Sequence, residues 1–125
     1  MITVYHWSKR ADLTDTDPAY AGTGTRGAER DRDQVRGTYF AELGYREYAV
    51  QANAHRYRAE LDSERVYCLD SDPLGLVLTA QQSGGNARFE FEKLVLNQGF
   101  IGYKAQDVYK IFVPVKIQLD NPHGA

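Results

Sequence analysis

Short runs of alternating polar and apolar residues near both ends of the chain most constrain its fold. Residues 2–6 alternate with the period of a strand, and residues 116–119 do the same near the other end. Ala87–Asn97 is the clearest helix, because its apolar residues share one face and Gln98-Gly99 is typical of a helix end. Strands around one clear helix predict an α+β fold and exclude a helical bundle.

The remaining strand candidates are short and are separated by turn-forming residues. They are residues 35–41, 45–50, 55–61, 66–69, 100–103, 108–113 and 115–119, with Pro114 marking a bulge or edge between the last two. The 9 Tyr and 11 Gly of the chain suit irregular sheets better than helical bundles. Pro73 is expected in the first turn of a second, short helix, at the start of an apolar run over residues 74–80.

The size and composition of the chain limit its class. Its 125 residues predict a single domain over residues 1–125. The one cysteine, Cys68, excludes an intramolecular disulfide, and no group of side chains has the spacing of metal ligands. A net charge of −2 argues against nucleic acid as a partner, although residues 55–58 mix basic and aromatic side chains that could stack on bases. No apolar run approaches the ~20 residues of a membrane-spanning helix, so a cytoplasmic location is expected.

Two segments near the start of the chain are candidates for ligand binding. His6 ends the first predicted strand, where it could orient a ligand with Ser8 as a nearby donor, or face solvent as a cap. Residues 22–27 (GTGTRG) lie in a long polar loop and match neither a Walker A motif nor a dinucleotide fingerprint. Their backbone amides could still meet a pyrophosphate beside Arg26, or the segment could be a flexible surface loop.

Several short motifs follow one another along the chain: VYHWS at residues 4–8, Asp17-Pro18 with Tyr20, GTG at 22–24, GAE at 27–29, TYF at 38–40, Tyr57, VY at 66–67, DPL at 72–74, GFIGY at 99–103 and YKIFVPVKI at 109–117. Taken in this order, they resemble the ADP-ribosyltransferase-like domains of phage and plasmid polyvalent proteins. Together they span most of the chain, although each is short. The resemblance implies a split, two-sheet α+β fold with few helices and with NAD in the cleft between the sheets.

The resemblance also implies roles for particular residues. His6 would orient the ribose of NAD beside Trp7 and Ser8, and Tyr39 would pack on the nicotinamide. In the family an acidic residue on a late strand stabilises an oxocarbenium-like transition state. No Glu stands between Gly102 and Phe112 here, so the acidic role falls to Asp107 or Gln106, in a segment predicted to be a turn. The loop glycines Gly24 and Gly27, with Arg26, would line the phosphate side.

These roles imply a mono-ADP-ribosyltransferase of a mobile element that uses NAD to modify a macromolecular target in a bacterial host. The missing late-strand Glu keeps a second hypothesis open, because Asp is shorter and Gln carries no charge to balance a developing cation. In that hypothesis the chain is a catalytically silent anti-defence inhibitor that binds a host or defence-system protein. A third is a module that binds NAD-related ligands without turnover.

Overall fold

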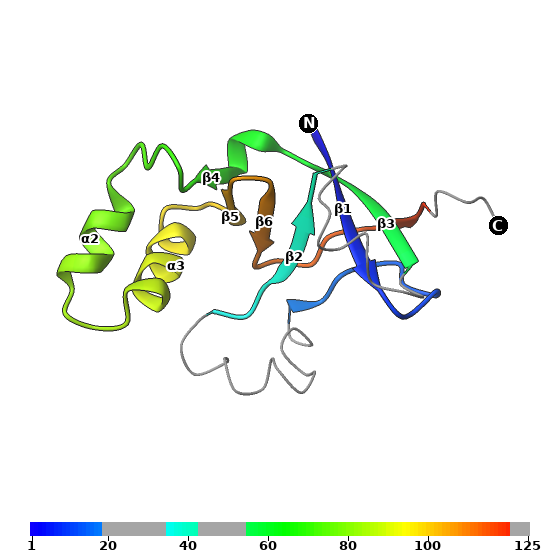
Figure 1. Ribbon diagram of the computed structural model, residues 1–125, viewed down its shortest axis with the longest axis horizontal. Helices are drawn as coiled ribbons and strands as arrows, with labels where there is room; N and C mark the ends of the chain where they lie inside the picture. The colour runs from blue at the N-terminus through cyan, green and yellow to red at the C-terminus, as the bar shows by residue number, and fades with distance from the viewer. Residues whose placement is uncertain (19–34, 43–54, 121–125) are drawn as a thin grey trace.

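The computed structural model describes residues 1–18, 35–42 and 55–120, and these residues form a mixed α/β structure (Figure 1). Its strands are β1 (Ile2–Ser8), β2 (Thr38–Ala41), β3 (His55–Leu61), β4 (Val66–Cys68), β5 (Gly102–Ala105), β6 (Val108–Ile111) and β7 (Gln118–Leu119). Its helices are α2 (Leu76–Gln82), α3 (Ala87–Asn97) and a short 3-10 turn, η2 (Ser63–Arg65). No helix in these ranges is long and apolar enough to cross a membrane.

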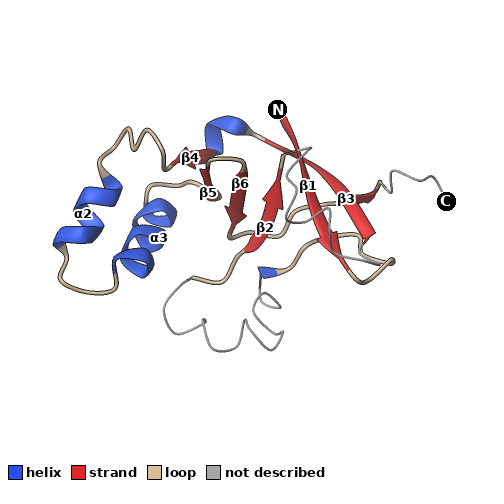
Figure 2. Ribbon diagram, viewed as in Figure 1, coloured by secondary structure: helices blue, strands red, loops and turns tan. Residues whose placement is uncertain are grey.

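The seven described strands form one sheet in the order β4-β5-β6-β2-β1-β3-β7. All neighbours are antiparallel except β4 and β5, which are parallel and are connected through both helices. The two helices therefore lie together beyond the β4–β5 end of the sheet (Figure 2). The expectation of two separate sheets is corrected here, because β6 pairs with β2 over four residues and β2 in turn pairs with β1.

Two apolar clusters of buried side chains pack the sheet and the helices. One lies on a single face of the sheet and contains Val4, Phe40, Tyr57, Ala59, Leu61, Ile101, Tyr109, Ile111 and Ile117. The other packs the helices on β4 and β5 and contains Tyr67, Leu76, Ala80, Phe91, Val95 and Tyr103. Along β3 the residues from Tyr57 to Leu61 alternate between buried and exposed, as a strand with one covered face requires.

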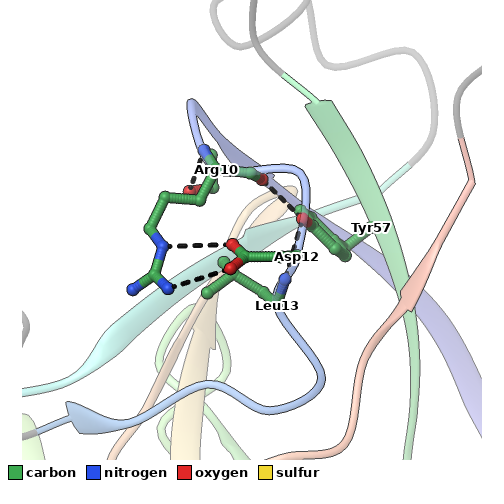
Figure 3. Close-up of polar contacts among 5 residues, drawn as sticks. Arg10, Asp12, Leu13 and Tyr57 are labelled. Atoms are coloured by element: carbon green, nitrogen blue, oxygen red, sulfur yellow. Dashed lines mark hydrogen bonds and ion pairs between the residues drawn. The ribbon is translucent and has the colours of Figure 1, made fainter.

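The loop after β1 closes over the first cluster through the hydroxyl of Tyr57 (Figure 3). This hydroxyl accepts a bond of 3.2 Å from the amide of Leu13 and donates to the carbonyl of Arg10. Arg10 and Asp12 form an ion pair at 3.3 Å on the exposed side of the same loop. The buried phenol is thus fully hydrogen-bonded, which removes the cost of placing a polar group in the core.

Most of the predicted elements are present, with shifted ends. The helix Ala87–Asn97 is confirmed, with the Asn86 side chain accepting from the amide of Phe89 as its N-cap. The first strand is also confirmed and extends to Ser8. The strand predicted over residues 108–113 ends at Ile111, because the amide of Phe112 bonds to the carbonyl of Ile101.

Three further boundaries differ from the predictions. Pro73 lies outside α2, because the carboxylate of Asp72 caps the amide of Val77 across a turn that ends at Gly75, whose φ is +66°. The predicted turn over residues 103–107 is shorter, since β5 continues to Ala105. The last predicted strand reduces to Gln118–Leu119, and the candidate strand over residues 45–50 lies outside the described residues.

The close approach of β5 and β6 at Gly102 gives a test of the fold. A Cβ at Gly102 would lie 2.1 Å from the Lys110 carbonyl oxygen and 2.8 Å from the Ile111 Cα, and backbone atoms cannot move aside cheaply. We expect Gly102→Ala to lower the free energy of unfolding by about 1–3 kcal/mol, measured by urea denaturation. The matched control is Gly85→Ala, whose nearest neighbour would be the flexible Glu90 side chain at 3.8 Å. Equal stability of the two variants would contradict the β5–β6 register.

Candidate functional site

The sheet has a seam between its central strands β1 and β2. These strands share one pair of residues in register, Tyr5 and Ala41, whereas β1 pairs with β3 along all of its seven residues. Past that pair, β1 and β2 diverge toward the Ser8 end of β1 (Figure 1). The half of the sheet made by β4-β5-β6-β2 is therefore joined to the half made by β1-β3-β7 over a very short stretch.

His6 bridges this seam. Its Nδ1 lies 2.8 Å from the carbonyl oxygen of Tyr39, and its ring lies 5.5 Å from the ring of Phe40. A backbone carbonyl in the middle of a sheet needs a donor, and here the imidazole takes the place of a β1 amide. Because a carbonyl can only accept, Nδ1 carries the proton and the lone pair of the neutral ring is on Nε2.

Burial keeps the His6 ring neutral. Loss of hydration lowers the pKa of the His6 imidazole below its usual range, and the bond to the Tyr39 carbonyl opposes this only in part. At neutral pH the ring therefore offers a hydrogen-bond acceptor at Nε2. Such an acceptor suits a hydroxyl of a ligand.

The phenol of Tyr39 lies on the other face of the sheet from the His6 ring. Tyr39 alternates with Phe40 along β2, and it pairs with Lys110 of β6, which pairs with Tyr103 of β5. Its hydroxyl accepts a bond of 2.7 Å from Nη2 of Arg88, a residue of α3. The structure thus joins His6 to the backbone of Tyr39 and does not bring the two rings together on one face.

Behind Tyr39 lies a buried ion pair between Glu92 of α3 and Lys110 of β6. The Lys110 ammonium is 2.6 Å from Oε2 of Glu92, and the two side chains are 3% and 0% exposed. Tyr103 donates to the same oxygen at 2.9 Å, and the amide of Val35 donates to Oε1 at 2.9 Å. Burial and the Glu92 charge raise the pKa of Tyr103 well above its usual range, so that its hydroxyl keeps its proton.

The remaining predicted site residues lie elsewhere. Trp7 is half-buried on β1, with its ring 6.2 Å from that of Tyr5, and Ser8 Oγ accepts from the amide of Arg10 at 3.2 Å. Gln106 and Asp107 form the exposed turn between β5 and β6. The loop residues Gly24, Arg26 and Gly27 lie outside the described residues.

The β5–β6 turn places Asp107 at the Tyr5–Ala41 end of the seam, away from the Ser8 end of β1. Val108 pairs with Ala41, the same residue that pairs with Tyr5, so the turn lies at this end. The carbonyl of Asp107 accepts from the amide of Glu42 at 3.1 Å, and the amide of Gln106 bonds to Asp70 at 2.8 Å. Backbone groups of this turn are thus bonded to Asp70 and Glu42, which lie in other segments of the chain.

Sequence reasoning missed two charged clusters. Glu92, Lys110 and Arg88 form the first, and its one signal in the sequence was Lys110, a lone charge within the apolar run of β6. In the second, Glu42 lies 2.8 Å from the Tyr109 hydroxyl and 3.1 Å from the Lys104 ammonium. Burial and then the bond to Glu42 raise the pKa of Tyr109 to about 12.

Comparison of the chain with protein-family models, curated proteins and solved structures finds no match. Among the described residues, no three His, Cys, Asp or Glu side chains lie together as the ligands of a metal ion would.

The neutral state of His6 predicts a pH dependence of stability. An unfolded histidine binds a proton below about pH 6.5, whereas the folded ring resists it, so the unfolded state holds more protons and stability falls as the pH drops from 7 to 5. His6→Asn keeps a side-chain N–H for the Tyr39 carbonyl and does not titrate. We expect the difference in unfolding free energy between the two proteins to change across this range. A constant difference would contradict a lowered pKa.

The buried pair predicts a large loss of stability when only one partner is removed. Lys110→Met leaves the Glu92 carboxylate buried without its cation and is expected to cost about 3–5 kcal/mol, measured by chemical denaturation. The double variant Lys110→Met with Glu92→Leu should recover a large part of this loss. Lys93→Ala is the control, because Lys93 makes an exposed ion pair worth less than about 1 kcal/mol. An equal cost for Lys110→Met and Lys93→Ala would contradict the pairing.

Proposed function

We propose that this chain is an ADP-ribosyltransferase-like protein that binds NAD at the seam between β1 and β2 and modifies a macromolecular target. One observation carries this proposal. Two of the residues that the resemblance assigns to NAD, His6 and Tyr39, lie on the two strands that flank the seam and are joined by a 2.8 Å contact.

The chemistry of the side chains at the seam suits NAD. Nε2 of a neutral His6 can accept from a ribose hydroxyl. Tyr39 is 37% exposed and offers an aromatic ring, and Arg88 beside its hydroxyl is a cation that a phosphate would pair with. Because the His6 and Tyr39 rings lie on opposite faces of the sheet, NAD lying on one face would contact one of the two rings directly.

The transfer step needs a negative charge near the ribose, where positive charge develops. Asp107 and Gln106, in the turn between β5 and β6, remain the candidates for this acidic role. That turn lies at the end of the seam where Tyr5 pairs with Ala41. That position favours the second candidate function, a catalytically silent protein of a phage or other mobile element. It would act in the bacterial cytoplasm by binding a host or defence-system protein.

Titration calorimetry with NAD tests the ligand. We expect wild-type protein to bind NAD, and His6→Ala to weaken binding by about 1–3 kcal/mol, the range for a lost buried hydrogen-bond partner. His55→Ala is the control, because His55 lies at the start of β3, across β1 from the seam. No binding by the wild type up to millimolar NAD would reject the ligand. Equal losses in both variants would reject the role of His6.

Labelled NAD incubated with the protein and a bacterial lysate separates the two functions. Transfer of the label supports the enzyme, and in that case Asp107→Asn should lower transfer by at least ~10²-fold with little change in NAD affinity. Full transfer by Asp107→Asn would remove Asp107 from the mechanism. Binding of NAD without transfer supports a sensor or an inhibitor instead.

A further inference from the structure

The carboxylate of Glu92 links α3 to β5, to β6 and to the segment before β2. Oε2 receives the Lys110 ammonium of β6 and the Tyr103 hydroxyl of β5, and Oε1 receives the amide of Val35, which precedes β2. Arg88, one turn earlier in α3, adds its Nε at 3.8 Å. The carboxylate is 0% exposed, so all of its hydration has been replaced by these donors.

The same donors surround Tyr39. The Lys110 ammonium lies 5.8 Å from the centre of the Tyr39 ring, and Arg88 donates to the Tyr39 hydroxyl at 2.7 Å. Val35, held by Glu92, lies four residues before Tyr39 on the segment that leads into β2. The ring and the hydroxyl of Tyr39 therefore each contact a cation that pairs with the Glu92 carboxylate, and Val35 ties the segment that leads into β2 to the same carboxylate.

The charges in this cluster do not cancel. Two cations, Lys110 and Arg88, face one carboxylate, and Arg88 is 46% exposed whereas Lys110 is almost fully buried. The excess positive charge therefore lies at the accessible edge, next to the Tyr39 hydroxyl. A buried pair of this kind is weak evidence for stability, because apolar residues of similar volume often stabilise a protein as well or better.

We propose that Glu92 is a positioning residue for ligand binding, which fixes Tyr39 through Lys110 and Arg88 so that the Tyr39 ring and the Arg88 cation present one surface to an anionic, ring-bearing ligand. The proposal rests on the function inferred above only in naming NAD as that ligand. The positioning of Tyr39 is a property of the protein alone and can be measured without NAD.

The experiment uses protein labelled at the tyrosine ¹³Cζ, with the Tyr39 signal assigned from its loss in Tyr39→Phe. Glu92→Gln and Arg88→Ala should both shift this signal and weaken NAD binding, Arg88→Ala by about tenfold for a lost charge-assisted hydrogen bond. Arg88→Lys should restore part of both. Lys93→Ala, which removes a cation of α3 paired to Glu90 at 3.0 Å, should change neither.

The outcomes separate the two proposals. An unmoved Tyr39 signal in Arg88→Ala, or in a folded Glu92→Gln, overturns the positioning role whether or not NAD binds. If Glu92→Gln fails to fold, Tyr103→Phe replaces it, since it removes a single hydroxyl from the carboxylate and should shift the Tyr39 signal in the same direction. A shifted signal in a protein that binds no NAD supports the positioning role and rejects the ligand.

Discussion

The packing of α3 on the sheet depends on one fully buried carboxylate, that of Glu92. An ion such as Glu92 is stable inside a protein only when a cation and further donors replace its hydration. Lys110, Tyr103 and Val35 supply these groups, and they come from β6, β5 and the segment before β2. The need to supply donors to this one side chain therefore restricts the position of α3 against β5 and β6. The apolar contacts of Phe91 and Val95 add burial to an arrangement that the charge has already restricted.

The seam between β1 and β2 follows a related rule for the backbone. Where β1 diverges from β2, a carbonyl of β2 would be left without a partner, and His6 supplies the missing donor. The same bond selects the tautomer of the ring, and burial keeps the ring neutral. Because the Tyr39 carbonyl takes the proton of Nδ1, the His6 side chain has one defined acceptor, Nε2, at the place where β1 and β2 share a single register pair. The proposed ligand site lies at this seam.

Helices and strands with a clear apolar periodicity could be predicted from the sequence. Ala87–Asn97 has an apolar face and a polar cap, and His55–Leu61 alternates, so both were predicted with the bounds that the structure has. The seam could not be predicted in this way, because a single register pair between two strands far apart in the chain produces no repeating pattern in the amino-acid sequence. The partners of Glu92 were also hidden, since Lys110 and Val35 lie far from it in the chain and meet it only through the packing of α3. His6 and Tyr39 were predicted as site residues because of the resemblance, and the structure shows that their rings lie on opposite faces of the sheet.

The parallel pairing of β4 and β5 bears on the order in which the chain assembles. Both helices lie between these two strands in the sequence, so β4, α2, α3, β5 and β6 come from one continuous stretch of chain. Such a stretch closes shorter loops than the pairing of β1 with β3 or of β2 with β6, and shorter loops cost less entropy. We infer that the helix-bearing half nucleates first and that β1, between β2 and β3, docks late. Destabilising changes at the seam should then mainly speed unfolding, whereas changes around Glu92 should slow folding.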